Sequence, residues 1–129
     1  MFKNSKKQGD AGLGQAIAYF TMKGYDVALP LTDSADWDMI VEIDGLLKRV
    51  QVKTSTSFNA QNTMKFEAAV RGGNKSSSNH SSKKIEQQQW DLIFLCHLVT
   101  GKQALIPKEK LETSNQINLG KKYEEYLIN

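Results

Sequence analysis

Residues 36–54 read Asp-Trp-Asp-Met-Ile-Val-Glu-Ile-Asp-Gly-Leu-Leu-Lys-Arg-Val-Gln-Val-Lys-Thr, with a strand-like run on each side of Asp44-Gly45. Asp-Gly between two such runs is a strong signal for a hairpin with a two-residue turn. Residues equally far from the turn then face each other, which places Asp38 opposite Gln51. Because side chains alternate along a strand, Lys53 shares a face with Gln51. The sequence therefore predicts an acid, an amide and a lysine at the open end of one hairpin.

These residue types suit the hydrolysis of a phosphodiester bond. Asp38 is a candidate anionic ligand for Mg²⁺, and the Gln51 side-chain oxygen and the Val52 carbonyl are candidate neutral ligands. Lys53 is a candidate for orienting or deprotonating the attacking water and for stabilising the developing negative charge. Asp10, near the start of a predicted helix, is either a first-turn acid favoured by the helix dipole or an additional metal ligand.

The length and composition indicate one domain over residues 1–129. The chain has 129 residues, of which 40% are hydrophobic, enough for one core. Its net charge of +3 permits a nucleic-acid partner without requiring one. No apolar run approaches the roughly 20 residues of a membrane span, and the first residues lack the apolar core of a signal peptide. We therefore expect no membrane association and a reducing cytoplasm, in which Cys96 is a buried structural thiol.

Hydrophobic periodicity predicts a mixed succession of helices and strands. A helix over residues 9–23 contains Gly12 and Gly14, which indicate either close approach of a backbone or ligand, or a late helix start. The continuous apolar run 91–99 predicts a central strand buried on both faces. The other predicted strands cover residues 25–30, 38–43, 46–54, 66–70 and 103–106, and short helices are predicted over 85–89, 108–112 and 121–128.

Two basic segments are candidates for contacts with a phosphate backbone. Residues 1–8, with Lys6 and Lys7, form either a frayed terminus or a phosphate-contacting arm. Residues 71–84 form a loop rich in Gly, Ser and Asn that is either a flexible connector or a segment that orders on DNA. The basic residues of this loop are Arg71, Lys75, Lys83 and Lys84.

Arg49 lies in the predicted hairpin. It is a diagonal neighbour of Glu42, with which it can pair across the strands.

The motif Asp36-Trp-Asp38-Met-Ile-Val and the motif Arg49-Val-Gln51-Val-Lys53-Thr resemble the PD-(D/E)XK nuclease superfamily. The chain looks most like the branch in which glutamine occupies the second acidic position. That branch includes the homing endonuclease encoded by a cyanobacterial group I intron and related small bacterial and phage nucleases. The resemblance covers roughly residues 9–107, from Gly9-Asp10 at the start of the helix to the late strands.

The resemblance implies a restriction-endonuclease-like core of the α/β (α+β) class, a mixed central β-sheet flanked by helices. It implies that Asp38 binds Mg²⁺, for which Mn²⁺ substitutes, and that Lys53 serves the water. Gln51 takes the place of the usual glutamate, and Asp10 that of the helix acid. The expected partner is DNA, positioned by the two basic segments and Arg49, and a homodimer or homotetramer is expected because two strands must be cut.

Three functions follow as hypotheses. The first is a Mg²⁺-dependent DNA endonuclease, either homing, with sequence-specific cleavage of duplex DNA, or like a Holliday junction resolvase, with a preference for branched DNA. The second is a catalytically degenerate DNA-binding module of the same fold, whose binding a chelator leaves unchanged. The third is a nuclease toxin or a restriction subunit.

Overall fold

The predicted hairpin is present, with its strands in the expected register. Strand β2 (Met39–Ile43) pairs antiparallel with β3 (Leu46–Ser55), and residues equally far from the turn are partners. Asp44 and Gly45 form the turn with φ angles of 52° and 81°. Two positive φ angles belong to a type I′ turn, whose twist matches that of the flanking strands. Strand β3 continues well beyond the last residue that β2 pairs with.

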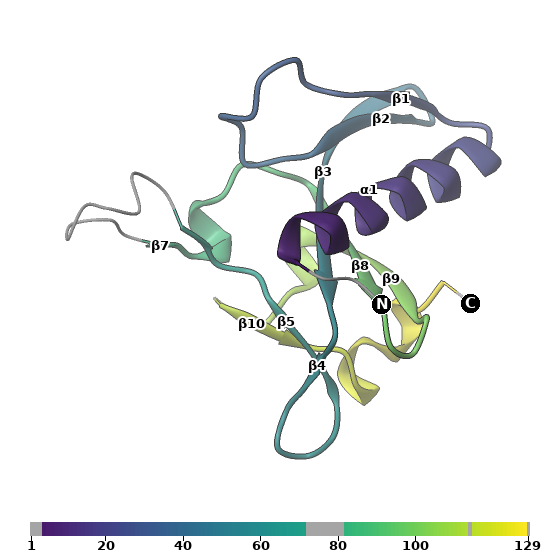
Figure 1. The fold of residues 1–129 in the computed structure, drawn as a ribbon. Coiled ribbons are helices and arrows are strands. Elements are labelled where there is room, and N and C mark those ends of the chain that lie inside the picture. Colours follow the sequence, from purple (N-terminus) through teal and green to yellow (C-terminus); the bar gives the residue numbers. More distant parts are fainter. Residues whose placement is uncertain (1–3, 72–81, 114, 129) are drawn as a thin grey trace.

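A mixed five-stranded sheet forms the centre of the protein, in the order β1-β2-β3-β8-β9 (Figure 1). Strands β3 and β8 are parallel, and the other neighbours are antiparallel. The computed structural model describes residues 4–71, 82–113 and 115–128. The sheet's other strands are β1 (Asp26–Ala28), β8 (Leu92–His97) and β9 (Gln103–Pro107). This is the mixed α/β sheet that the sequence predicted.

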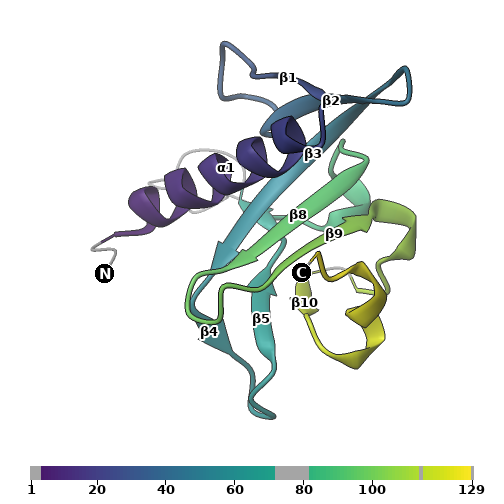
Figure 2. The ribbon, with the colours of Figure 1, turned by 90° about the vertical axis from the view of Figure 1, so that its right-hand side faces the viewer.

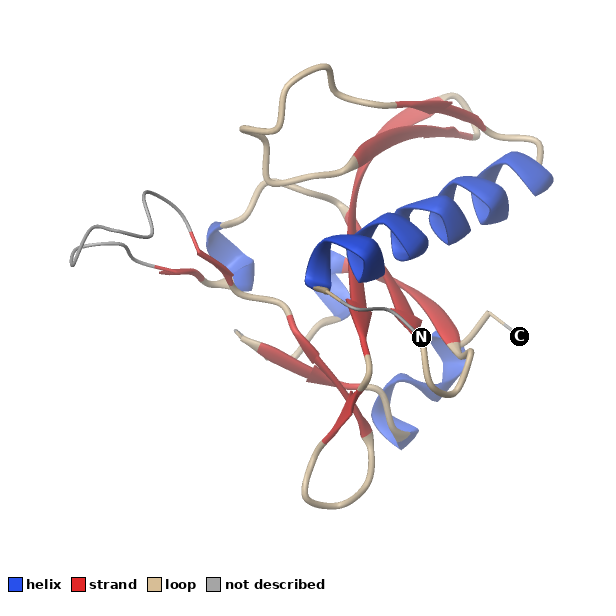
Figure 3. Cartoon of the chain, viewed as in Figure 1, coloured by secondary structure: helices blue, strands red, loops and turns tan. Residues whose placement is uncertain are grey.

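Helix α1 (Ser5–Met22) lies along one face of the sheet (Figures 2 and 3). It begins before the predicted start, because the Asn4 side chain accepts a hydrogen bond from the Lys7 amide (2.9 Å) and caps the first turn. Lys6 and Lys7 therefore belong to a helix. A frayed terminus, one of the two alternatives for residues 1–8, is therefore wrong over residues 5–8, whereas a phosphate-contacting role stays a prediction. Residues 1–3 lie outside the described part.

The sheet is buried on both faces. Phe94 and Cys96 of β8 pack on the α1 side with Phe20, and the intervening Ile93 and Leu95 pack on the other side. That second side is covered by β5, β10 and η3 (Figure 2). Burial on both faces explains the unbroken apolar run of β8.

Shorter elements surround the central sheet and correct several expectations. The region 55–65, expected to be a turn, contains β4 and the start of β5, and β10 is a strand that no pattern predicted. The segment 71–84, expected to be a loop, is bounded by paired strands β6 and β7, and residues 72–81 lie outside the description. These strands are β4 (Ser57–Phe58), β5 (Met64–Glu67), β6 (Val70–Arg71), β7 (Ser82–Lys83) and β10 (Gln116–Asn118).

The three short predicted helices are 3₁₀ helices. They are η1 (Ile85–Gln87), η2 (Lys108–Lys110) and η3 (Lys121–Tyr126). In the part of the chain that the structure describes, no helix is long and apolar enough to cross a membrane.

Gly12 marks the place where α1 crosses β3. A Cβ atom added at Gly12 would lie 2.0 Å from Thr54 Cγ2, whereas one added at Gly14 would meet nothing within 4 Å. The predicted close approach is therefore confirmed at Gly12, and a late helix start is wrong. The absence of a side chain here lets α1 lie directly on the part of β3 that follows Gln51.

We predict opposite effects on stability for alanine at these two glycines. Gly14→Ala should raise the free energy of unfolding by about 1 kcal/mol, the helix-propensity difference. Gly12→Ala should lower it by about 1–3 kcal/mol, because Thr54 is stiff at χ1 and must move. Adding Thr54→Ser, which removes Cγ2, should recover most of that loss. Urea denaturation checks all three; equal effects of the two alanines would contradict the close approach.

Candidate active site

The Asp38 carboxylate occupies the place of a strand partner for β3. The Asp38 amide donates to the Val50 carbonyl at 2.8 Å, and the Val52 amide donates to Asp38 Oδ2 at 2.7 Å. Strand β2 begins only at Met39, so the carboxylate satisfies an amide that no backbone carbonyl of β2 reaches. Both hydrogen bonds fix the orientation of Asp38 at the open end of the hairpin.

The Val52 carbonyl faces the same gap as Asp38. In an extended strand the N–H and C=O of one residue point to the same side, and residues two apart point alike. The Val50 carbonyl and the Val52 amide both bond to Asp38. The Val52 carbonyl therefore points toward the gap that β2 leaves, as required of a candidate metal ligand.

Gln51 is buried, with 6% of its surface exposed, and its side-chain amide joins this group. The end of this amide lies 3.0 Å from Asp38 Oδ2 and 2.7 Å from the Asp36 carbonyl oxygen; because both of these atoms are acceptors, we assign the amide nitrogen to this position, where it donates to both. The predicted proximity of Asp38 and Gln51 is thus present in the structure. Rotation of the amide by half a turn would bring its oxygen to the same place.

Lys53 is half-buried near Asp38, and burial affects both charges. Burial lowers the pKa of Lys53, and the Asp38 carboxylate opposes that change. Burial raises the pKa of Asp38, against the opposing effects of the Val52 hydrogen bond and the Lys53 charge. A lysine with a lowered pKa is more often neutral near pH 7, and a neutral amine can accept a proton from water.

Asp10 lies on α1 beside the site but makes no direct bond to it. The preceding Gly9 lines a groove with Lys53, and Leu13, one helical turn after Asp10, lines a second groove with Asp38. Asp10 is exposed, and no hydrogen bond or ion pair joins it to Asp38 or Lys53 in the structure. Its role as an additional metal ligand stays a prediction.

The oxygens at this gap fit a hard divalent cation. The Gln51 amide nitrogen now lies between a carboxylate oxygen and a carbonyl oxygen, so a donor already occupies the point where oxygens converge. Mg²⁺ is bound in proteins by oxygen ligands and keeps several waters. Asp38, the Val52 carbonyl and the Gln51 oxygen after rotation would hold it. Nowhere in the described residues, this gap included, do three or more His, Cys, Asp or Glu side chains gather.

A groove of about 390 Å³ extends from Lys53 along the end of β3. Its walls include residues 52–57 and, from β5, Lys65 and Glu67. Lys65 was missed as a candidate because the region 55–65 was expected to be a turn. The alternation Met64-Lys-Phe-Glu67 around the buried Phe66 was the available signal, since it puts Lys65 and Glu67 on one face.

Two of the predicted DNA contacts are paired within the protein. Arg49 lies beside Asp91: its amide donates to Asp91 Oδ2 at 2.8 Å, and its Nε lies 3.7 Å from the same oxygen. The expected pairing of Arg49 with Glu42 is wrong. Asp91 immediately precedes β8, and the parallel pairing of β8 with β3 places it beside Arg49. Lys83 is ion-paired with Asp36 at 3.2 Å.

The remaining predicted contacts lie on the surface or beyond the description. Lys6, Lys7 and Lys84 are exposed. Arg71 pairs through its backbone in β6, and Lys75 lies outside the described residues.

Cys96 is a buried free thiol, as predicted, and its Sγ contacts Gln15 Oε1 at 3.1 Å. Burial raises the pKa of this thiol, which disfavours the reactive thiolate. The thiol is therefore part of the packing between α1 and the sheet.

Comparisons with known proteins agree with this geometry. Residues 3–125 match the family model described as PD-(D/E)XK endonuclease. The fold is similar to that of a bacterial homing endonuclease, I-Ssp6803I, with a TM-score of 0.74 and 20% identity, over 92% of this chain and 79% of that chain. No curated protein matches the sequence. The resemblance drawn from the Asp38 and Gln-Val-Lys motifs is confirmed, as is the restriction-endonuclease-like fold.

We predict that the buried charges lower stability. The double variant Asp38→Asn/Lys53→Met removes both charges while keeping the acceptor for the Val52 amide and the stem of Lys53. In chelator it should unfold at a higher free energy than the native chain, by on the order of 1 kcal/mol, because desolvation dominates both pKa shifts. Thermal and urea denaturation measure this; a less stable double variant would mean that the pair stabilises the fold.

Proposed function

Because the chain belongs to the PD-(D/E)XK endonuclease family, we propose that it is a Mg²⁺-dependent DNA endonuclease that uses Asp38, Gln51 and Lys53. The observation that carries this proposal is the gap at the end of β2. There a carboxylate, an amide and a backbone carbonyl face one point, and a desolvated lysine lies beside them. We further propose that Mn²⁺ substitutes for Mg²⁺.

The site residues divide the work of hydrolysis. Asp38, Gln51 and the Val52 carbonyl would hold the cation, which when bound supplies positive charge to the phosphate and lowers the pKa of a bound water. Lys53, with its lowered pKa, orients the attacking water and accepts its proton. A protonated Lys53 then stabilises the negative charge that develops on the phosphate.

DNA lies along the groove at the end of β3 in this proposal. The groove brings Lys65 and a row of serine and threonine hydroxyls next to Lys53, and such groups are the usual partners of phosphate oxygens. Lys6 and Lys7 lie on the turn of α1 that precedes groove residues Gln8 and Gly9. Among Asp38, Gln51 and the Val52 carbonyl, only Asp38 carries a negative charge. A DNA phosphate oxygen would therefore complete the ligands of the cation, together with Asp10 if its side chain reaches the site.

A homing role is favoured over junction resolution by the likeness to the fold of a bacterial homing endonuclease. A homing enzyme cuts duplex DNA at a defined sequence, whereas a resolvase prefers a four-way junction to linear duplex. We also propose that the protein acts as a homodimer or homotetramer, because one site of this size cuts one strand at a time.

We predict that Lys53→Ala reduces DNA cleavage by about 100-fold or more, the usual size of a general-base contribution, and leaves DNA binding nearly unchanged. Supercoiled, linear and four-way-junction DNA are incubated with Mg²⁺ or with chelator, and binding is followed by gel shift. Lys121→Ala, at an exposed position of η3 that does not line the groove, is the matched control and should cut normally. Cleavage that continues in chelator, or in Lys53→Ala, would overturn the proposed chemistry.

We predict that Gln51→Glu makes stability depend more strongly on metal. Without metal the new carboxylate faces Asp38 and the Asp36 carbonyl, so the melting temperature should fall. With Mg²⁺ the extra charge should tighten binding by about tenfold and raise the melting temperature by more than in the native chain. Gln61→Glu, with the same charge change in the exposed β4–β5 turn, should show neither effect. Equal Mg²⁺ shifts in both variants would remove Gln51 from the ligands.

A further inference from the structure

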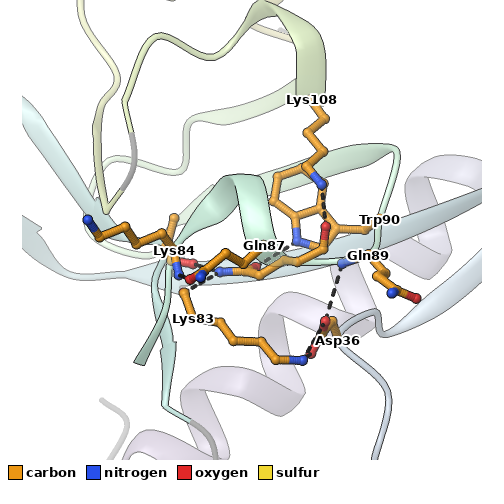
Figure 4. A network of polar contacts seen from close by, with 9 residues as sticks. Asp36, Lys83, Lys84, Gln87, Gln89, Trp90 and Lys108 are labelled. Carbon is orange, nitrogen blue, oxygen red and sulfur yellow. Dashed lines mark hydrogen bonds and ion pairs between the residues drawn. The ribbon is translucent and has the colours of Figure 1, made fainter. Parts of the chain in front are cut away.

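Asp36 contacts two different parts of the protein at once. Its carboxylate accepts hydrogen bonds from Lys83 Nζ, 3.2 Å from each oxygen, and from the Gln89 amide at 3.2 Å (Figure 4). Its carbonyl oxygen lies 2.7 Å from the Gln51 amide nitrogen. Asp36 therefore connects β7 and the segment after it to a side chain of the candidate active site.

The segment that holds the Asp36 carboxylate is itself fixed to the core. Gln88, 1% exposed, donates from its side chain to the carbonyls of Ala68 (2.8 Å) and Lys83 (2.9 Å). The Trp90 indole donates to Gln88 Oε1 at 2.7 Å. The Lys108 ammonium adds a hydrogen bond to the Gln88 carbonyl. Lys83 and Gln89 thus hold the Asp36 carboxylate from a rigid support.

The ion pair is sheltered on the Asp36 side. The Asp36 side chain is 13% exposed, whereas that of Lys83 is 51% exposed. An isolated exposed ion pair contributes little to stability, about 0–1 kcal/mol. Stability alone therefore does not account for the pairing of Lys83 with Asp36. Groups that orient a ligand of a metal site commonly change metal affinity or activity by about 10–100-fold when they are removed.

We propose that Asp36 is a positioning residue: held by Lys83 and Gln89, it fixes the segment that carries the Asp36 carbonyl and Asp38 against the Gln51 side chain, and so keeps the metal site assembled. Lys83 then acts through Asp36 and contributes less to DNA affinity than its charge suggests. This inference rests on the proposed function only in taking Asp38 and Gln51 as ligands of the metal. In the metal-free protein the Gln51 amide is held by the Asp36 carbonyl and by Asp38 Oδ2, and the first of these contacts depends on the bonds from Lys83 and Gln89 to Asp36.

Lys84 supplies a matched control for Lys83. It is the next residue in the chain, it is exposed, and its side chain extends away from Asp36 (Figure 4). Lys83→Met and Lys84→Met remove the same charge at neighbouring positions of the chain. Only the first change removes a partner of Asp36.

The first test measures Mg²⁺ affinity by calorimetry without DNA, and DNA affinity in chelator. Lys83→Met and Asp36→Ala should weaken Mg²⁺ binding by about tenfold, while Lys84→Met leaves it unchanged. Asp36→Asn keeps an oxygen for Lys83 and Gln89 and should recover most of the affinity. In chelator, Lys84→Met should weaken DNA binding more than Lys83→Met. Unchanged Mg²⁺ affinity in Lys83→Met, with DNA binding weakened as in Lys84→Met, would make Lys83 a simple phosphate contact.

The second test needs neither metal nor DNA. Hydrogen exchange of the Gln51 side-chain amide, followed by NMR in chelator, should be about tenfold faster in Lys83→Met and Asp36→Ala than in the native chain or Lys84→Met. Unchanged exchange would overturn the positioning role even if the protein cuts DNA. Faster exchange in a protein that binds no Mg²⁺ would instead keep the role of Asp36 and count against the proposed function.

Discussion

The hydrogen bond from the Val52 amide to the Asp38 carboxylate is the constraint around which the site is built. Strand β3 continues beyond Val50, the last residue that β2 pairs with, so the Val52 amide has no backbone partner in β2. A buried amide left without a partner costs about 1–3 kcal/mol. Asp38 supplies the acceptor at 2.7 Å. The same bond that completes the sheet therefore aims a carboxylate into the gap, next to the Gln51 amide and the Val52 carbonyl. One hydrogen bond therefore serves both the stability of the sheet and the placement of the metal ligand.

The surrounding structure makes this gap both rigid and poorly hydrated. On one face, Gly12 lets α1 lie against Thr54 without an intervening side chain. Along the edge of β3 that faces away from β2, the strand pairs with β8, whose residues are buried on both faces. Burial of Lys53 and Asp38 lowers the pKa of the lysine and raises that of the acid. Such shifts reduce stability, and they are typical of sites that transfer protons.

The parts of the fold set by local pattern were predictable from the sequence. Asp44-Gly45 determines the turn and hence the register, and the apolar run of β8 signals a strand buried on both faces. The turn region before β5 and the partner of Arg49 were not predictable, because both depend on chain segments that meet only in the folded protein. Asp91 reaches Arg49 through the parallel pairing of β3 and β8. The positions of Asp38, Gln51 and Lys53 were predictable because the Asp44-Gly45 turn fixes which residues of the hairpin face each other.

The position of the cation is the central claim, and Mn²⁺ tests it most directly. Mn²⁺ is paramagnetic and broadens the NMR signals of nearby amides. In a titration of the ¹⁵N-labelled native protein, the backbone signals of Asp38, Gln51, Val52 and Lys53 should disappear first, at Mn²⁺ concentrations far below that of the protein. Broadening that begins elsewhere, such as at Asp91 or η2, while these four signals persist, would contradict a metal site at the end of β2.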